Sequence, residues 1–171
     1  MIQKHDMCAE VQTHNITFVL NPDNIWNSYK DEFREITENG NWQEVKFLND
    51  DASKLNTDIE NVPNNCGGVY IFILKGQIIP VSHVYILYVG RVRYTNNQNL
   101  RKRLKEYLND NRPKIEAMRR TWGNNLYIKY LPLDDNAVIT QLEEELIRVI
   151  IPPCNDKYPS VINKAIQAAF M

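Results

Sequence analysis

The sequence predicts an α+β fold, a small three-stranded antiparallel sheet flanked by helices, with an acidic N-terminal α/β extension. Two runs of β-branched and aromatic residues, 69–74 and 84–89, are separated by glycine, proline and polar residues, and they predict a two-stranded ribbon. A third run, 126–133, alternates in polarity and predicts the third strand. Apolar residues recur at helical spacing between and after these runs, so the expected order of core elements is β-β-α-α-β-α.

We expect the chain to divide into an N-terminal extension, residues 1–65, and a core domain, residues 66–171. The boundary is placed in the stretch 49–65, which is polar, contains Pro63 and has the composition of a loop or linker. A chain of 171 residues with 43% hydrophobic content can bury one sizeable core. The extension is therefore expected to pack on the core or to be linked to it.

The extension carries four candidate elements. Residues 16–20 are a candidate strand, and residues 23–37 place apolar side chains at helical spacing after an Asn-Pro-Asp start, which predicts an amphipathic helix. Residues 42–48 are a second candidate strand, and residues 52–55 are a candidate helical turn.

The core is expected to contain three main helices. Residues 98–108 and 112–121 follow the ribbon, and residues 137–151 follow the third strand. Capping residues, glycine or proline stand at the ends of these segments, which supports the boundaries. Residues 165–170 are a candidate for a short terminal helix.

Two charged side chains are expected to lie against apolar surface. Arg103 sits at the margin of the apolar stripe of its helix, so we expect its guanidinium to be held against the body of the protein. Glu143 falls inside the apolar sector of its helix, whereas Glu144 and Glu145 fall outside it, as surface carboxylates. A carboxylate that faces a core is costly unless it is paired, protonated or bound to a cation. An internal ion pair and a metal site are both open interpretations of Glu143.

Five side chains form a set whose chemistry suits phosphodiester cleavage: Tyr70, Tyr88, Arg103, Glu143 and Asn155. One carboxylate with water molecules is an ordinary way to hold Mg²⁺, and arginine offers planar, bidentate donors to phosphate. A tyrosine can orient or deprotonate the attacking water only when cations act on its phenol, because its unperturbed pKa is about 10.

The motifs Gly68-Val69-Tyr70 and Tyr88-Val89-Gly90 resemble the paired signatures of the GIY-YIG nuclease family. The resemblance covers residues 67–156 and is greatest for the nucleotide-excision-repair endonuclease branch. Two further segments carry it, the run from Asn99 to Tyr107 and the pattern that begins at Leu142 and ends Pro152-Pro153-Cys154-Asn155.

This resemblance implies a metal-dependent endonuclease that hydrolyses phosphodiester bonds in DNA, one strand per active site, with Mg²⁺ or Mn²⁺ as cofactor. It implies six catalytic positions, of which Glu143 is also the metal ligand: Tyr70, Tyr88, Arg103, Tyr107, Glu143 and Asn155. Tyr70 is expected to be the general base or the phenol that positions water, with Tyr88 as its partner. The 17 residues between these two tyrosines, more than is usual in the family, and the acidic extension depart from the family pattern.

Other interpretations stay open for these residues. Tyr70 and Tyr88 can be cross-strand packing aromatics, Arg91 a solvated turn residue, and Asn155 a cap of backbone groups at a helix end. For the whole protein, the alternatives are a catalytically inactive nucleic-acid-binding module and an RNA endonuclease. An exposed loop residue is the expectation for His83.

Charge is distributed unevenly along a chain whose formal net charge is only −1. Residues 1–66 hold 5 Lys/Arg against 12 Asp/Glu, and residues 91–130 hold 11 against 3, so their net charges are −7 and +8. The basic segment predicts a surface for DNA, with RNA not excluded, and its candidate nucleic-acid-binding residues are Arg91, Arg93, Arg101, Lys102 and Lys105. We expect the acidic extension to dock near this surface and to restrain non-specific binding.

Several classes of protein are not expected. The chain has no apolar run long enough to span a membrane and no signal-peptide pattern at its start, so a cytoplasmic location is expected. Its three cysteines lack Cys-x-x-Cys spacing, which argues against a zinc site and against a disulfide framework. No protein partner can be inferred from the sequence.

Overall fold

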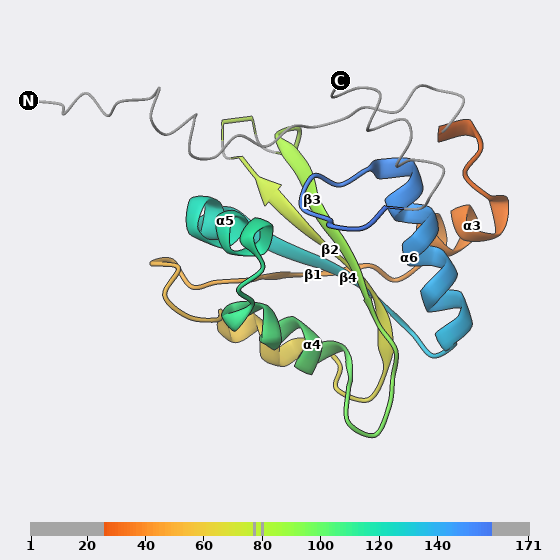
Figure 1. The fold of residues 1–171 in the computed structure, drawn as a ribbon, viewed down its shortest axis with the longest axis horizontal. Helices are drawn as coiled ribbons and strands as arrows, with labels where there is room; N and C mark the ends of the chain where they lie inside the picture. The colour runs from red at the N-terminus through yellow and green to blue at the C-terminus, as the bar shows by residue number, and fades with distance from the viewer. Residues whose placement is uncertain (1–25, 77, 80, 159–171) are drawn as a thin grey trace, which may run out of the picture.

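The computed structural model describes residues 26–76, 78–79 and 81–158. These residues form an α+β fold with a four-stranded antiparallel sheet and four α-helices (Figure 1). The strands are β1 Gln43–Lys46, β2 Gly67–Lys75, β3 Val84–Val92 and β4 Leu126–Leu133. The helices are α3 Asp31–Asn39, α4 Leu100–Glu106, α5 Pro113–Trp122 and α6 Asn136–Ile150, with short 3-10 helices η1 Thr57–Asn61, η2 Tyr107–Asn109 and η3 Gly123–Asn125.

The order of strands across the sheet is β1-β4-β2-β3, so β3 and β1 are the edge strands. The three strands predicted for the core are confirmed, but the expectation of a three-stranded sheet is wrong, because β1 adds a fourth strand beside β4. β1 lies within the candidate strand 42–48 of the extension, and its Gln43 and Val45 lie opposite Tyr130 and Ile128. Part of the predicted extension therefore completes the core sheet.

The three predicted core helices are confirmed as α4, α5 and α6, although η2 replaces the last turn expected for the first of them. The helix predicted over residues 23–37 is only partly right: α3 begins at Asp31, after Lys30 with extended backbone at ψ 134°. The helical turn expected at 52–55 is wrong, because Leu55 forms a β-bridge with Leu48. The candidate strand 16–20 and the candidate helix 165–170 lie outside the described residues.

The helices cover both faces of the sheet (Figure 1). Alternation along β2 sends Tyr70 and Phe72 into one buried cluster with residues of η1, α4 and α5. It sends Val69 toward the opposite cluster, which is built by α6 and Phe33 of α3. The fold is thus three layers, and residues on the two faces of one strand reach different helices.

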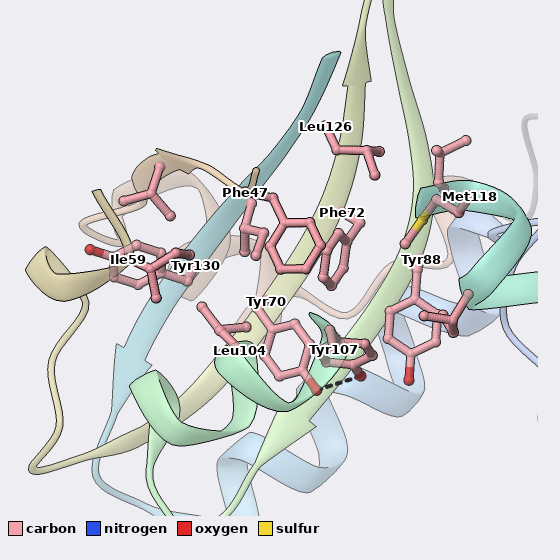
Figure 2. Close-up of a cluster of buried hydrophobic side chains, with 14 of the residues drawn as sticks. Phe47, Ile59, Tyr70, Phe72, Tyr88, Leu104, Tyr107, Met118, Leu126 and Tyr130 are labelled. Atoms are coloured by element: carbon pink, nitrogen blue, oxygen red, sulfur yellow. Dashed lines mark hydrogen bonds between the residues drawn. The ribbon is translucent and has the colours of Figure 1, made fainter. Parts of the chain in front are cut away.

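A β-bulge in β3 sets the direction of Tyr88. Phe72 lies opposite Tyr88 and Ile73 lies opposite Ile86, so Leu87 is an extra residue in β3. Leu87 and Tyr88 consequently both join the cluster that contains Tyr70. Figure 2 shows Tyr70, Phe72, Tyr88 and Tyr107 gathered in this cluster, where their rings meet edge to face at centroid distances of 5.0–6.5 Å.

Helix α6 has well-defined ends. The side chain of Asp135 accepts hydrogen bonds from the backbone N–H groups of Ala137 and Val138, which caps the first turn. Ile151 takes a left-handed conformation at φ 51° and ends the helix before Pro152. The chain then turns back to β3, where the N–H of Cys154 donates to the carbonyl of Leu87 at 2.9 Å. In the part of the chain that the structure describes, no helix is long and apolar enough to cross a membrane.

Candidate active site

A cleft of about 970 Å³ is lined by residues of β2, β3, α4, α6 and the segment after α6. It brings together five of the six residues predicted to be catalytic: Tyr70, Tyr88, Arg103, Glu143 and Asn155. Arg91 also lines it. The sixth, Tyr107, is fully buried behind Tyr70. Side chains that are far apart in the sequence therefore share one concave surface, as a substrate site requires.

Tyr70 lies at the wall of this cleft with its ring packed over Gly90 of the neighbouring strand. Its hydroxyl lies 2.9 Å from the hydroxyl of Tyr107 and donates to the carbonyl of Arg91 at 3.4 Å. Burial raises the pKa of Tyr70 well above its ordinary value of 10.0. The phenol is therefore un-ionised near neutral pH, which suits a group that positions water better than one that removes a proton.

Arg103 is held against the protein, as the sequence predicts. Its guanidinium lies 4.9 Å from the ring centre of Tyr107, and its Nε donates to the Tyr70 hydroxyl at 3.3 Å. Its Nη1 donates to Glu106 at 2.8 Å. Helix α4 and η2, which follows it directly, fix these contacts, because Glu106 and Tyr107 come three and four residues after Arg103 and so lie on the same face. The arginine is fixed in position while it still lines the cleft.

Tyr88 and Tyr70 are packing aromatics and cleft residues at the same time. Tyr88 is 8% exposed and packs edge to face on Phe72 and Tyr107. Both tyrosines nonetheless line the cleft. The packing interpretation therefore does not exclude a role for either side chain in the site.

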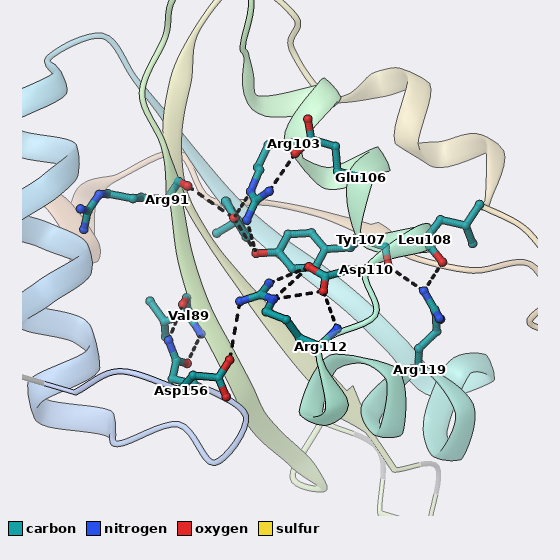
Figure 3. A network of polar contacts seen from close by, with 12 residues as sticks. Val89, Arg91, Arg103, Glu106, Tyr107, Leu108, Asp110, Arg112, Arg119 and Asp156 are labelled. Carbon is teal, nitrogen blue, oxygen red and sulfur yellow. Dashed lines mark hydrogen bonds and ion pairs between the residues drawn. The ribbon is translucent and has the colours of Figure 1, made fainter. Parts of the chain in front are cut away.

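Glu143 is paired with Arg91, as the ion-pair interpretation of its inward position expects. Nη1 of Arg91 donates to Oε2 of Glu143 and lies 3.8 Å from Oε1 of Glu144. The Glu143 side chain is only 14% exposed, and burial raises its pKa although the charge of Arg91 opposes the shift. Figure 3 shows Arg91 directed toward α6, on the other side of the strand from Arg103.

A metal ion would have few protein ligands at this site. Within residues 26–76, 78–79 and 81–158, no group of three or more histidine, cysteine, aspartate or glutamate side chains is placed to hold one. Mg²⁺ accepts such a setting, because it commonly binds through one or two carboxylates and keeps several water ligands. Glu143 fits this role provided that the ion shares or displaces its contact with Arg91.

Asn155 holds the backbone of β3. Its Oδ1 accepts from the N–H of Val89 at 2.9 Å, and its Nδ2 donates to the carbonyl of Val89 at 2.8 Å. The side chain is 5% exposed. It does not cap the end of α6, as one interpretation of the sequence has it, but fixes the strand residue between Tyr88 and Gly90.

The predicted nucleic-acid-binding residues all have partners within the protein. Arg91 contacts Glu143, and Arg93 donates from Nε and Nη2 to Thr140 at 3.0 and 2.8 Å. The other three residues lie on α4. Arg101 donates to the carbonyl of Val62 and pairs with Glu60, and Lys105 also donates to Glu60. Lys102 donates to the carbonyl of Asn97. Of these five residues, Arg91 alone lines the cleft. Glu60 belongs to the predicted extension, so acidic and basic segments meet here as expected.

Sequence reasoning placed one carboxylate wrongly and missed one arginine. Glu145 is 7% exposed and not at the surface, because Arg148 and the backbone N–H of Lys30 cover it. Arg112, interpreted from the sequence only as the start of a helix, lines the cleft beside Tyr88. The spacing Asp110-x-Arg112 was the available signal, since an aspartate two residues earlier can fix an arginine side chain.

Other features lie away from the site. Within the link between β2 and β3, the described residues Ile78, Ile79 and Val81 are exposed, and none of them lines the cleft. His83 packs against Tyr85 at a centroid distance of 5.2 Å and is also outside the cleft. Cys66 and Cys154 are buried free thiols.

Comparisons of the chain with protein-family models, with curated proteins and with solved structures find no match. The residues of the motifs and their placement around the cleft are therefore the basis for any functional assignment.

Proposed function

We propose that this protein is a metal-dependent endonuclease of the GIY-YIG type, which hydrolyses phosphodiester bonds in DNA and cuts one strand per active site. One observation carries the proposal: five residues of the expected catalytic set, contributed by β2, β3, α4, α6 and the segment after α6, line a single cleft. The sixth residue of the set, Tyr107, lies outside the cleft and supports Tyr70 through a hydrogen bond between the two hydroxyls.

Arg103 supplies a positive charge that can bind and stabilise a phosphodiester. Arg103 is fixed by Glu106 and Tyr107, so little side-chain entropy is lost when it binds an anion. A guanidinium can donate two parallel hydrogen bonds to phosphate and stabilise the charge that develops during displacement.

The tyrosines suit the control of water. The Tyr70 hydroxyl already hydrogen-bonds with Arg103, Tyr107 and the carbonyl of Arg91, so it would engage a water molecule in exchange for one of these contacts, of which the one to the carbonyl is the longest. Because burial raises the pKa of Tyr70, the hydroxyl orients the nucleophile, and the proton of that water passes to bulk solvent through the open cleft.

Glu143 is the residue that would hold Mg²⁺ or Mn²⁺. When bound, such an ion neutralises charge on the phosphate and assists departure of the leaving oxygen. Arg91, now the partner of Glu143, would be released toward the phosphate of the substrate, where its charge stabilises the bound strand.

The test is cleavage of supercoiled plasmid by the purified protein with Mg²⁺ or Mn²⁺. We expect nicked circles, and we expect Glu143→Gln to lower the rate by at least about a hundredfold, as loss of a metal carboxylate does. Glu116→Gln, on α5 and away from the cleft, is the matched control and should cleave like the wild type. Equal cleavage by Glu143→Gln and the wild type would refute the mechanism.

The contact between Arg91 and Glu143 favours a second candidate, a nucleic-acid-binding module without catalysis, because a permanent ion pair would occupy the metal carboxylate. That candidate predicts salt-sensitive DNA binding and no cleavage with any divalent metal. An RNA substrate in the same assay separates DNA from RNA hydrolysis.

A further inference from the structure

Arg112 precedes the first residue of α5 and lies outside the catalytic set that the sequence predicts. Its side chain is 35% exposed and lines the cleft together with Tyr88 and Arg103. Several contacts hold this side chain in place. Those contacts indicate what the side chain can do.

Asp110 fixes the plane of the Arg112 guanidinium. Nε of Arg112 lies 3.1 Å from both carboxylate oxygens of Asp110, and Nη2 donates to Oδ2 at 2.7 Å. These hydrogen bonds hold the pKa of Asp110 below its ordinary value, so the carboxylate stays ionised. The Nε and Nη2 edge is therefore engaged. Nη1 of Arg112 lies 3.9 Å from Oδ2 of Asp156, and this distance is too long for a hydrogen bond. Asp156 also lines the cleft.

Arg112 and Arg103 share an aromatic neighbour (Figure 3). The guanidinium carbon of Arg112 lies 5.7 Å from the ring centre of Tyr107 and 5.6 Å from that of Tyr88. The guanidinium carbon of Arg103 lies 4.9 Å from the ring centre of Tyr107. Each of the two cations has its own carboxylate partner, Glu106 for Arg103 and Asp110 for Arg112.

Arg112 and Arg103 both line the cleft, and a planar guanidinium suits the non-bridging oxygens of a phosphodiester, so each can bind a phosphate of one strand. We propose that Arg112 is a further phosphate-binding arginine of this site, in addition to Arg103 and Arg91, and contacts the substrate strand. The proposal rests on the proposed function for the identity of the substrate, a nucleic acid. Beyond that function, the proposal states that Arg112 binds an anionic strand directly.

A purely structural role for Arg112 makes a different prediction. If Arg112 only holds the turn before α5 through Asp110, then the pair Asp110→Asn and Arg112→Gln, whose amides can hydrogen-bond to each other, should restore normal binding. If Arg112 contacts phosphate, the double variant folds and still binds weakly, because the cation is gone.

The experiment measures binding of a fluorescein-labelled single-stranded decathymidylate by fluorescence anisotropy, in EDTA and at several salt concentrations. We expect Arg112→Gln and the double variant to bind at least about tenfold more weakly than the wild type, the effect of losing one charge-assisted hydrogen bond. The slope of log affinity against log salt should become less steep by about 0.7 in each, because one phosphate contact is lost. Arg112→Lys, which keeps the charge but not the planar fork, should fall between them and the wild type.

Arg120→Gln is the matched control, since Arg120 lies on α5, the helix that follows Arg112, is 75% exposed and pairs with Glu116. It should change the affinity less than twofold. Wild-type affinity in the double variant, or a wild-type protein that does not bind the oligonucleotide, would overturn the proposal. The plasmid assay judges the proposed function separately: a protein that binds through Arg112 but never cleaves loses the hydrolase assignment alone.

Discussion

Gly90 determines where the phenol of Tyr70 can lie. The two residues face each other across β2 and β3, and a Cβ atom at position 90 would lie 2.7 Å from the hydroxyl oxygen and from ring carbons of Tyr70. The ring cannot move away cheaply, because it packs against Phe72 and Tyr107 in a close-packed core. The glycine of β3 is thus a steric requirement of the site.

We expect Gly90→Ala to lower the free energy of unfolding by about 1–3 kcal/mol, the usual cost of overpacking a core, and to reduce plasmid nicking because the hydroxyl moves. Urea unfolding and the nicking assay measure the two effects. Tyr70→Phe is the comparison: it keeps the ring and should cost only about 1 kcal/mol, yet it should also lose nicking. A Gly90→Ala protein with wild-type stability would contradict the packing of Tyr70.

The sequence predicts single side chains well where local geometry decides their direction. Arg103 and Glu143 were placed against apolar surface by helix periodicity alone, and the structure confirms both placements. Glu145 was misplaced because its burial depends on Lys30 and Arg148, and a helical wheel contains no tertiary neighbours. The partnership of Arg112 with Tyr88 likewise depends on how α5 packs on the sheet.

Among the elements, the segment after α6 has no regular secondary structure, yet it is hydrogen-bonded to the edge strand β3. Cys154 and Asn155 hydrogen-bond to Leu87 and Val89, so this segment covers the outer edge of β3 beside the cleft. The Cys154 side chain is buried, and desolvation raises its pKa to about 11 from an ordinary 9.0. The docking of this segment is therefore sensitive to ionisation of the thiol.

Ionisation of the Cys154 thiol makes the stability of the protein depend on pH. Because the folded pKa of Cys154 is the higher one, its contribution to stability is complete below pH 9 and is lost as the pH rises from 9.0 through about 11. The loss is on the order of 3 kcal/mol once the pH exceeds both values. Urea unfolding at pH 8 and at pH 10.5 should show a smaller loss of stability in Cys154→Ala than in the wild type. Equal losses would mean that the thiol is not buried as described.

At the scale of the molecule, opposite charges that are separated along the sequence lie in contact. Glu60 pairs with Arg101 and Lys105 of α4, and Glu44 of β1 pairs with Lys75 of β2. The acidic segment thereby lowers the positive potential of α4, the helix expected to attract nucleic acid. Deleting residues 1–60 would not test this effect cleanly, because the deletion removes β1 from the sheet.

Glu60→Gln is a cleaner test of restraint by the acidic segment. We expect it to raise DNA affinity about twofold to fivefold at low salt, because Arg101 and Lys105 become available to phosphate, and to have little effect at high salt, where surface charges are screened. Anisotropy with a labelled DNA duplex measures the change. Glu44→Gln, which releases Lys75 instead, is the control. An unchanged affinity for Glu60→Gln at low salt would show that the ion pairs do not limit binding.

The pairing of β1 also has a consequence for the order in which the protein folds. Lys46 lies opposite Tyr127, so β1 has no strand partner until β4, some 80 residues later in the sequence, has been synthesised. Contacts this distant in sequence close slowly, since a large loop must lose entropy before they form. While the chain emerges from the ribosome, the backbone groups of Val45 and its neighbours have no strand partner, and the sheet is completed only after β4 has been synthesised.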